Sequence, residues 1–90
     1  MSEPHDHRIK RLRMRSMRRG IKEMDLILTA FAGARLTRMT EDELALYDAL
    51  LHENDQDLYQ WVTGQVAPPD RFAAMIAEIS RALQPAPDPT

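Results

Sequence analysis

Residues 21–33, IKEMDLILTAFAG, have the strongest helical pattern in this chain of 90 residues. Apolar side chains recur there at spacings of three or four, as one face of an α-helix requires: Ile21, Met24, Ile27, Leu28 and Phe31. Gly33 follows the last of them, and glycine is typical of a helix end. We therefore predict a helix that ends at Gly33 and forms the centre of the core.

The segment before this helix has a thinner apolar stripe. It starts after Arg8, is filled out with arginines and is interrupted at Gly20: Ile9, Leu12, Ser16 and Met17. The polar residues 1–7 contain Pro4 and show no periodicity, so we expect them to be disordered. A first helix is predicted from Arg8, with a break at Gly20.

A capping pattern marks the start of a third helix. Thr40 and Glu43 have the spacing at which each side chain bonds the other residue's backbone N–H, and Met39 and Leu44 can form the accompanying hydrophobic staple. The predicted helix ends near Glu53. Its inward face carries four residues: Leu44, Tyr47, Leu50 and Leu51.

Two further helices complete the chain. Asn54 or Asp55 can cap a short fourth helix that Gly64 closes, and its apolar residues are Leu58, Trp61 and Val62. A fifth helix begins at about Pro69, where proline suits a first turn, and its buried stripe is Phe72, Ile76, Ile79 and Leu83. We expect Trp61 to pack in the core, and Tyr47 to bury its ring while its hydroxyl stays at the rim.

These patterns together predict an all-α protein. No segment alternates with period two or shows a two-residue hairpin turn, so no sheet is expected. The prediction is one compact five-helix bundle at residues 8–84, with a proline-rich flexible tail at residues 85–90. The connections are short, so neighbouring helices should pack antiparallel or at right angles.

Charge is distributed unevenly along the chain. Residues 1–22 hold eight Lys/Arg against two acidic residues, whereas residues 23–90 hold four against twelve. This asymmetry indicates that the basic end contacts something acidic, such as nucleic acid, lipid head groups or a protein surface. There is no cysteine and no long apolar run, so we expect a soluble cytoplasmic protein without membrane insertion.

Few residues could support catalysis. The only histidines are His5, His7 and His52, too few and too scattered for a zinc site, and the three glycines form no phosphate-binding loop. Asp55 and Asp57 are paired carboxylates, but at a helix start we interpret them as capping and dipole-matching residues. We therefore predict no catalytic, cofactor-binding or metal-binding residues.

Residues 18–25, RRGIKEMD, combine choices that stability alone does not favour. Like charges four apart repel one another by roughly 0.2 to 0.5 kcal/mol per pair, and a glycine within a helix costs about 1 kcal/mol. The pairs here and just upstream are Arg11–Arg15, Arg15–Arg19 and Arg18–Lys22. Arg19 and Glu23 can form only a weak ion pair. Two interpretations stand: a solvated basic face with a helix break at Gly20, or a contact surface where the missing Cβ admits another backbone.

The motif Arg19-Gly20-x-x-Glu23 resembles the SdhE family of succinate dehydrogenase assembly factors, relatives of the mitochondrial Sdh5 proteins. The resemblance extends over residues 8–83. It includes the acid-rich helix start at residues 40–43, the Leu50-Leu51 pair and the segment DQDLYQW at residues 55–61. The motif alone is weak, but together with that tryptophan segment in a short all-helical chain it is fairly specific.

The resemblance implies a five-helix protein that binds the flavoprotein subunit of succinate dehydrogenase and promotes covalent attachment of FAD to a histidine of that subunit. Fumarate reductase flavoproteins are further expected clients. The chain would act as a non-catalytic monomer without stably bound cofactor, since the FAD belongs to the client. The motif match assigns five partner-binding residues: Arg18, Arg19, Gly20, Glu23 and Asp25.

Three alternatives remain at this stage. The basic helix could bind nucleic acid, although it lacks stacking aromatics and the acidic body would be repelled. The chain could be an antitoxin-like partner of some other protein. A third alternative is an amphipathic helix on anionic lipid. It is the weaker one, because the apolar stripe before Gly20 is narrow.

Overall fold

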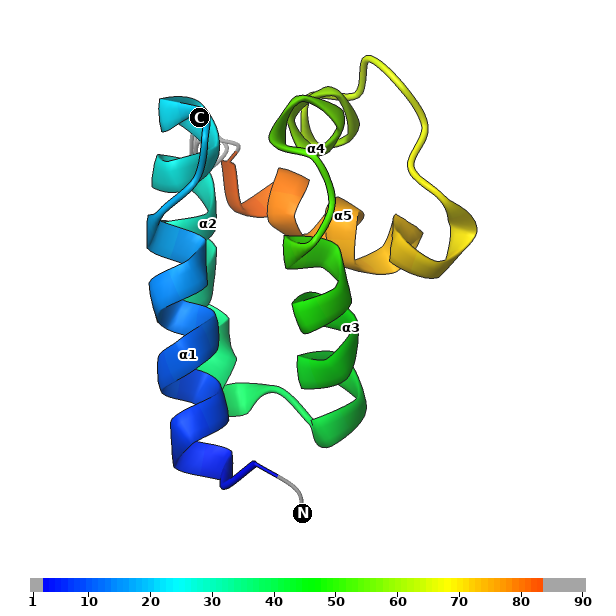
Figure 1. The fold of residues 1–90 in the computed structure, drawn as a ribbon. Helices are drawn as coiled ribbons and strands as arrows, with labels where there is room; N and C mark the ends of the chain where they lie inside the picture. Colours follow the sequence, from blue (N-terminus) through cyan, green and yellow to red (C-terminus); the bar gives the residue numbers. More distant parts are fainter. Residues whose placement is uncertain (1–2, 84–90) are drawn as a thin grey trace, which may run out of the picture.

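A computed structural model describes residues 3–83 of the chain. Within that range it contains no strand, one short 3-10 helix and five α-helices: α1 (His5–Met17), α2 (Lys22–Arg35), η1 (Leu36–Arg38), α3 (Glu41–Leu51), α4 (Asp55–Val62) and α5 (Asp70–Leu83) (Figure 1). The predicted all-α, single-domain, five-helix architecture is confirmed for these residues. The predicted tail at residues 85–90 lies outside them.

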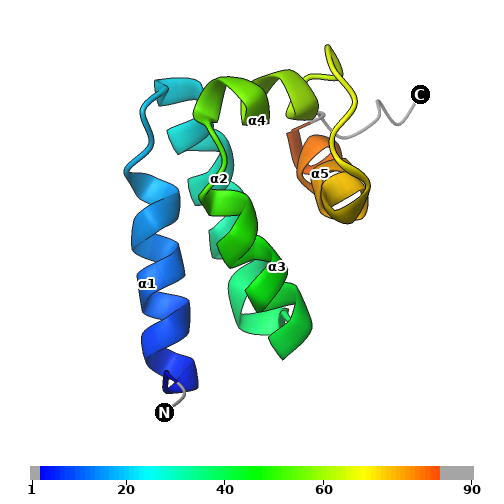
Figure 2. The ribbon, with the colours of Figure 1, turned by 45° about the vertical axis from the view of Figure 1, so that its right-hand side comes forward.

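The helices are arranged around α2. α1 and α2 lie side by side and run in opposite directions, joined by residues 18–21 at one end of the molecule (Figure 1). α4 crosses that same end, and α5 packs against α2, α3 and α4 (Figure 2). The connection between α1 and α2 therefore lies beside the start of α4, far from it in sequence.

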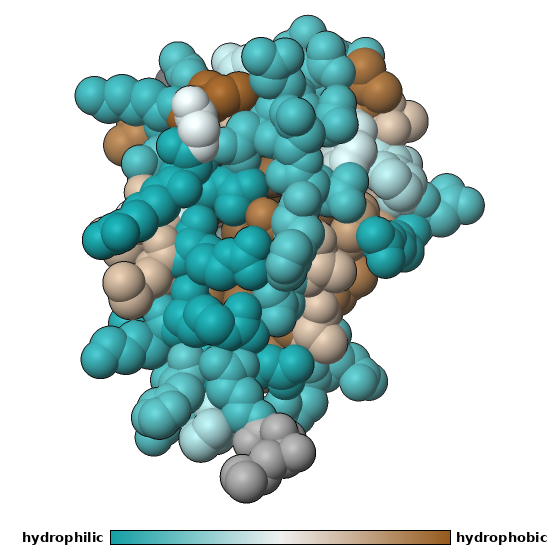
Figure 3. All heavy atoms as spheres, in the orientation of Figure 1, coloured by the Kyte–Doolittle hydropathy of each residue, from teal (hydrophilic) through white to brown (hydrophobic). Residues whose placement is uncertain are grey.

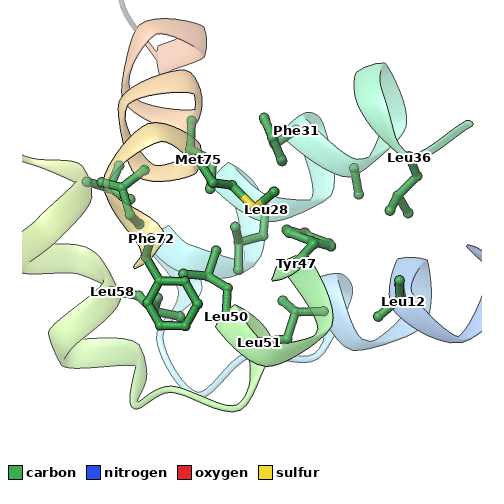
Figure 4. Packing of buried hydrophobic residues seen from close by; sticks show 14 of the residues in the cluster. Leu12, Leu28, Phe31, Leu36, Tyr47, Leu50, Leu51, Leu58, Phe72 and Met75 are labelled. Carbon is green, nitrogen blue, oxygen red and sulfur yellow. The ribbon is translucent and has the colours of Figure 1, made fainter. Parts of the chain in front are cut away.

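The core forms where α2 meets the other helices, as predicted from its apolar face (Figure 4). Met24 and Leu28 are fully buried, and the Phe31 ring lies 5.7 Å from the Tyr47 ring of α3. α5 contributes Phe72, whose ring lies 6.2 Å from that of Trp61. Trp61 is partly buried against this cluster, which agrees with its predicted packing role. The clustering explains how a short chain without disulfides can fold.

The hydroxyl of Tyr47 is buried, so the prediction that it stays at the rim is wrong. Tyr47 is 0% exposed, and its hydroxyl lies 2.6 Å from the hydroxyl of Ser16 on α1. Ser16 in turn donates to the carbonyl of Leu12 at 2.8 Å. Burial raises the pKa of Tyr47 to about 12, so this O–H remains a donor at neutral pH. The pair satisfies both buried hydroxyls.

The helix caps follow the sequence closely. Thr40 accepts the backbone N–H of Glu43 at 3.1 Å, and the Glu43 side chain accepts the N–H of Thr40 at 2.9 Å, which confirms the capping box. Asn54, one of the two predicted candidates, caps α4 by accepting the N–H of Gln56 at 2.8 Å. Gly64 follows α4 with a φ of 81°, a left-handed conformation that favours glycine.

Two helix boundaries differ from prediction. α1 begins at His5 instead of Arg8, so the predicted disorder does not hold for the described residues from His5 onward. Glu41 of α3 contacts both His5 and Arg8 and so fixes this first turn. α2 continues past Gly33 to Arg35, because the next turn is held by buried Leu36 and by ion pairs of Arg35.

One face of α1 and the residues just after it carry arginines that contact acidic side chains of α3 and α4. The ion pairs are Arg8–Glu41 (2.8 Å), Arg11–Asp48 (2.9 Å), Arg15–Asp48 (3.5 Å) and Arg19–Asp55 (2.6 Å). We call these four side chains the arginine stripe. Much of the charge asymmetry of the sequence is therefore neutralised within the chain, which the sequence analysis did not anticipate.

The surface of the described residues is mainly hydrophilic on the face drawn in Figure 3, with scattered apolar areas. Five large apolar side chains are substantially exposed in this part of the chain: Met14, Met17, Leu26, Val66 and Leu83. Among residues 3–83, no helix has the length and apolar character needed to cross a bilayer.

The buried face of α2 generates a first prediction. Leu28→Ala should lower the free energy of unfolding by about 2 to 5 kcal/mol, because it leaves a cavity at a fully buried position. Leu26→Ala is the matched control, since Leu26 lies on the same helix and is 64% exposed; its cost should stay within about 0.5 kcal/mol. Urea unfolding followed by circular dichroism measures both. An equal loss of unfolding free energy in Leu28→Ala and Leu26→Ala would contradict the assignment of Leu28 to the core.

The arginine stripe generates a second prediction, on pH. Hydrogen bonds from Arg11 hold the pKa of Asp48 below its ordinary value of 3.8. A depressed carboxyl pKa stabilises the fold above the pKa of the unfolded chain, and this contribution is lost as pH falls through the folded value. Asp48→Asn should therefore lower stability by about 1 kcal/mol at pH 7 in low salt.

The difference in unfolding free energy between wild type and Asp48→Asn should narrow below about pH 4, as the carboxyl group takes up its proton. Urea titrations at a series of pH values between 7 and 3 measure it. A difference that stays constant across this range would show that the ion pair contributes nothing.

Candidate functional site

The five predicted partner-binding residues lie together, in the connection between α1 and α2 and the first turn of α2. Arg18, Gly20 and Glu23 are exposed. Arg19 is turned into the protein, and its side chain is 8% exposed. Asp25 is partly buried and accepts a hydrogen bond from Thr29 one turn later, at 3.3 Å. Three of the five are therefore open to a partner, and their partner-binding role stays a prediction.

Arg19 is bound almost entirely within the chain. Its Nε and Nη2 atoms lie 2.8 and 2.6 Å from the same Oδ1 atom of Asp55, at the start of α4. Nη1 donates to the carbonyl of Leu51 at 3.0 Å, and Nη2 to that of Glu53 at 3.4 Å. The Leu51 carbonyl ends α3 and would otherwise lack a helical partner, and the Glu53 carbonyl lies in the connection that follows. Arg19 thus ties the loop to the α3–α4 connection.

The weak ion pair considered between Arg19 and Glu23 does not form, because the guanidinium group is engaged with Asp55. Glu23 consequently keeps its carboxylate free of any ion pair among residues 3–83. Of these two opposite charges beside Gly20, Arg19 is therefore turned inward and only Glu23 faces solvent. Gly20 itself is exposed, so the loop stays accessible.

Gly20 is also held by Asp55. Its backbone N–H donates to Oδ2 of Asp55, the oxygen that Arg19 leaves free. A Cβ added at Gly20 would lie 3.2 Å from that same oxygen, closer than ordinary van der Waals contact. The group that crowds this position thus belongs to this chain. The sequence analysis had left two interpretations of Gly20 open: a helix break on a solvated basic face, or a position where a partner's backbone approaches.

A hollow opens beside this loop. It has a volume of about 380 Å³ and lies between the start of α2 and one face of α4, lined by Ile21, Glu23, Gln56, Tyr59, Gln60 and Gln65. The lining combines one carboxylate, three side-chain amides and the partly buried Ile21 and Tyr59. Such groups can bind a polypeptide through hydrogen bonds and apolar contact.

A second hollow of about 640 Å³ lies along α1. Its lining is basic apart from one methionine: His7, Lys10, Arg11, Met14, Arg15, Arg18 and Arg19. Several of these cations are members of the arginine stripe and already have acidic partners. Among the described residues, no three His, Cys, Asp or Glu side chains come close enough to hold a metal ion.

Asp55 is the residue that sequence reasoning missed. Its position at a helix start favoured a capping role, but Asn54 caps α4 and leaves the Asp55 carboxylate for the loop. Asp55 and Arg19 are 36 residues apart, so no local pattern connects them. The one available indication was the run of unfavourable arginine spacings in α1, which implied acidic partners elsewhere.

Comparison with known proteins agrees with the motif. Residues 10–83 match the family Sdh5, described as "Flavinator of succinate dehydrogenase". Succinate dehydrogenase assembly factor 2 of Saccharomyces cerevisiae is 45% identical over 75 residues, which cover 80% of this chain and 46% of that protein. Its Candida glabrata counterpart is 49% identical over 63 residues, or 70% and 41%. That of Drosophila grimshawi is 40% identical over 80 residues, or 87% and 54%.

These relatives correct one prediction and establish the family. They are named as mitochondrial proteins, so the predicted cytoplasmic location is wrong. The lack of an apolar run had carried no information about the compartment. This chain spans about half the length of the curated relatives it matches. The family match covers nearly all of the described residues, and the chain therefore belongs to the Sdh5 family.

Proposed function

We propose that this chain binds the flavoprotein subunit of succinate dehydrogenase and promotes covalent attachment of FAD to a histidine of that subunit. The observation that carries the proposal is the match of residues 10–83 to the family described as flavinator of succinate dehydrogenase. The names of the relatives, succinate dehydrogenase assembly factors, support the same role. Fumarate reductase flavoproteins, built alike, are further proposed clients.

The proposed contribution is one of positioning. Both bond-forming groups, the histidine and the flavin, belong to the client, so this chain supplies neither nucleophile nor cofactor. Holding the client's parts in reactive geometry removes much of the entropic barrier to their meeting. A small, rigid helical scaffold is suited to this task because its loop conformation is set before binding. We propose that it acts as a monomer.

The proposed contact surface is the exposed loop around Gly20. Arg18 offers an exposed guanidinium that has no ion pair among residues 3–83, and Glu23 offers a carboxylate beside the hollow. Groups of both signs next to exposed backbone can recognise polar groups of a protein partner. Arg19 acts indirectly in this proposal, since its donors are engaged inside the chain.

The nucleic-acid alternative loses support from the arginine stripe. Four of the eight cations in the basic segment are paired with acidic residues of the same chain. Phosphate contacts would have to replace these ion pairs or use the remaining cations alone. Co-purification distinguishes the proposed function from that of an antitoxin-like protein. The proposed function predicts that this chain captures a flavoprotein dehydrogenase subunit, whereas an antitoxin-like protein would capture some other protein.

The decisive experiment follows flavin in the client. Cells lacking this protein should show a reduced in-gel fluorescence of covalent flavin in the dehydrogenase subunit, and wild type should restore it. Gly20→Arg should fail to restore it, because its Cβ would crowd the Asp55 carboxylate and its long cationic side chain would cover the loop. The helix content of the variant, measured by circular dichroism, should persist.

Gly33→Arg is the matched control. Gly33 is also exposed, but a Cβ there meets nothing within 4 Å. It should restore the flavin signal fully. Equal restoration by both variants would refute the loop as the contact surface, and capture of a protein other than a flavoprotein dehydrogenase subunit would refute the function.

A further inference from the structure

We propose that Asp55 is a positioning residue: its carboxylate fixes the Arg19–Gly20 loop in the conformation that the flavoprotein client binds. This inference rests on the proposed function, because that function makes the loop a contact surface. It adds a residue of α4 to a site otherwise formed by α1 and α2. Asp55 itself touches neither client nor flavin in this scheme, since its side chain is only 13% exposed.

The two carboxylate oxygens of Asp55 bind different residues of the loop. Oδ1 accepts a hydrogen bond from Nε of Arg19 at 2.8 Å and lies 2.6 Å from Nη2 in the ion pair. Oδ2 accepts the backbone N–H of Gly20. Because the acceptor is charged, the hydrogen bond from Arg19 and the one from Gly20 are each stronger than a hydrogen bond between neutral groups. Two consecutive residues of the loop are therefore held by one side chain.

The Asp55 carboxylate is available for these contacts because it does not cap its own helix. Asn54 caps α4 and accepts the N–H of Gln56, although an aspartate in the first turn could also serve the helix terminus. The contacts of Asp55 are instead made 35 and 36 residues away in sequence. This use of the side chain is explained by the loop and by nothing local.

Only an ionised carboxylate satisfies both partners. An asparagine has one acceptor oxygen, and its amide group would point an N–H at either Arg19 or Gly20, which are themselves donors. One of them would lose its acceptor. Because Arg19 is nearly buried, this loss would leave a charge without compensation, or the loop would shift to release it. The first outcome weakens the hold on the loop, and the second moves the exposed backbone around Gly20.

The test compares Asp55→Asn with Asp57→Asn. Asp57 lies two residues after Asp55 in the same helix, is exposed and has no ion pair among residues 3–83. Purified flavoprotein subunit and FAD are titrated with each variant at a temperature where thermal unfolding curves show the variant fully folded. The measured quantity is the concentration of this chain that gives half-maximal covalent flavin attachment.

Asp55→Asn should raise the half-maximal concentration by about tenfold or more, as expected when an internal charged hydrogen bond is broken. Asp57→Asn should leave it unchanged within about twofold, as expected of an exposed substitution. A residue that only stabilised the fold would not change the affinity of protein that is already folded. Equal half-maximal concentrations for wild type and Asp55→Asn would overturn the inference.

A second measurement needs no variant. Gly20 is an exposed residue whose amide hydrogen is bound to Asp55, so in wild type this hydrogen should exchange with deuterium more slowly than the neighbouring amide hydrogen of Ile21. Exchange of Gly20 as fast as that of Ile21 would overturn the inference even if Asp55→Asn did not fold. Wild type that has no effect on flavin attachment would instead overturn the proposed function.

Discussion

The nearly buried pair of Arg19 and Asp55 is the contact on which the rest of this small structure depends. It joins the end of the α1 region to the start of α4, and it also satisfies carbonyls at the end of α3. Removing either partner of such a pair costs about 3 to 5 kcal/mol, because a charge then stays buried without compensation. For a domain of this size that is a large share of the total stability.

The arginine stripe, to which this pair belongs, accounts for the close spacing of arginines in the sequence. Arginines spaced four apart repel each other within a helix, and the basic segment contains several such pairs. In the folded chain each member of the arginine stripe faces an acidic side chain of another helix. The repulsion within α1 is thus offset by attraction between helices, and the charges help to specify which surfaces pack together.

Gly20 shows how a functional motif and a structural constraint can coincide. The residue is exposed, which suits a contact surface. Its N–H donates to Asp55, and its lack of a Cβ leaves room for that carboxylate. A substitution here would disturb the fold of the loop as well as any surface it presents. Glu23 differs, because it is exposed and has no ion pair among the described residues, so it is free for an external partner.

The sequence by itself determined the helices and most of their inward faces, since periodicity, the Thr40 capping box and Gly64 act over a few residues. The exceptions are Met17 and Leu83, which belong to the predicted apolar stripes but are exposed. The sequence also located the exposed motif at Gly20 and Glu23. Tertiary structure alone decided that Arg19 turns inward, that Asp55 holds the loop and that the Tyr47 hydroxyl is buried against Ser16. These contacts join residues more than 30 positions apart, and their partners are chosen by helix packing, which no local pattern encodes.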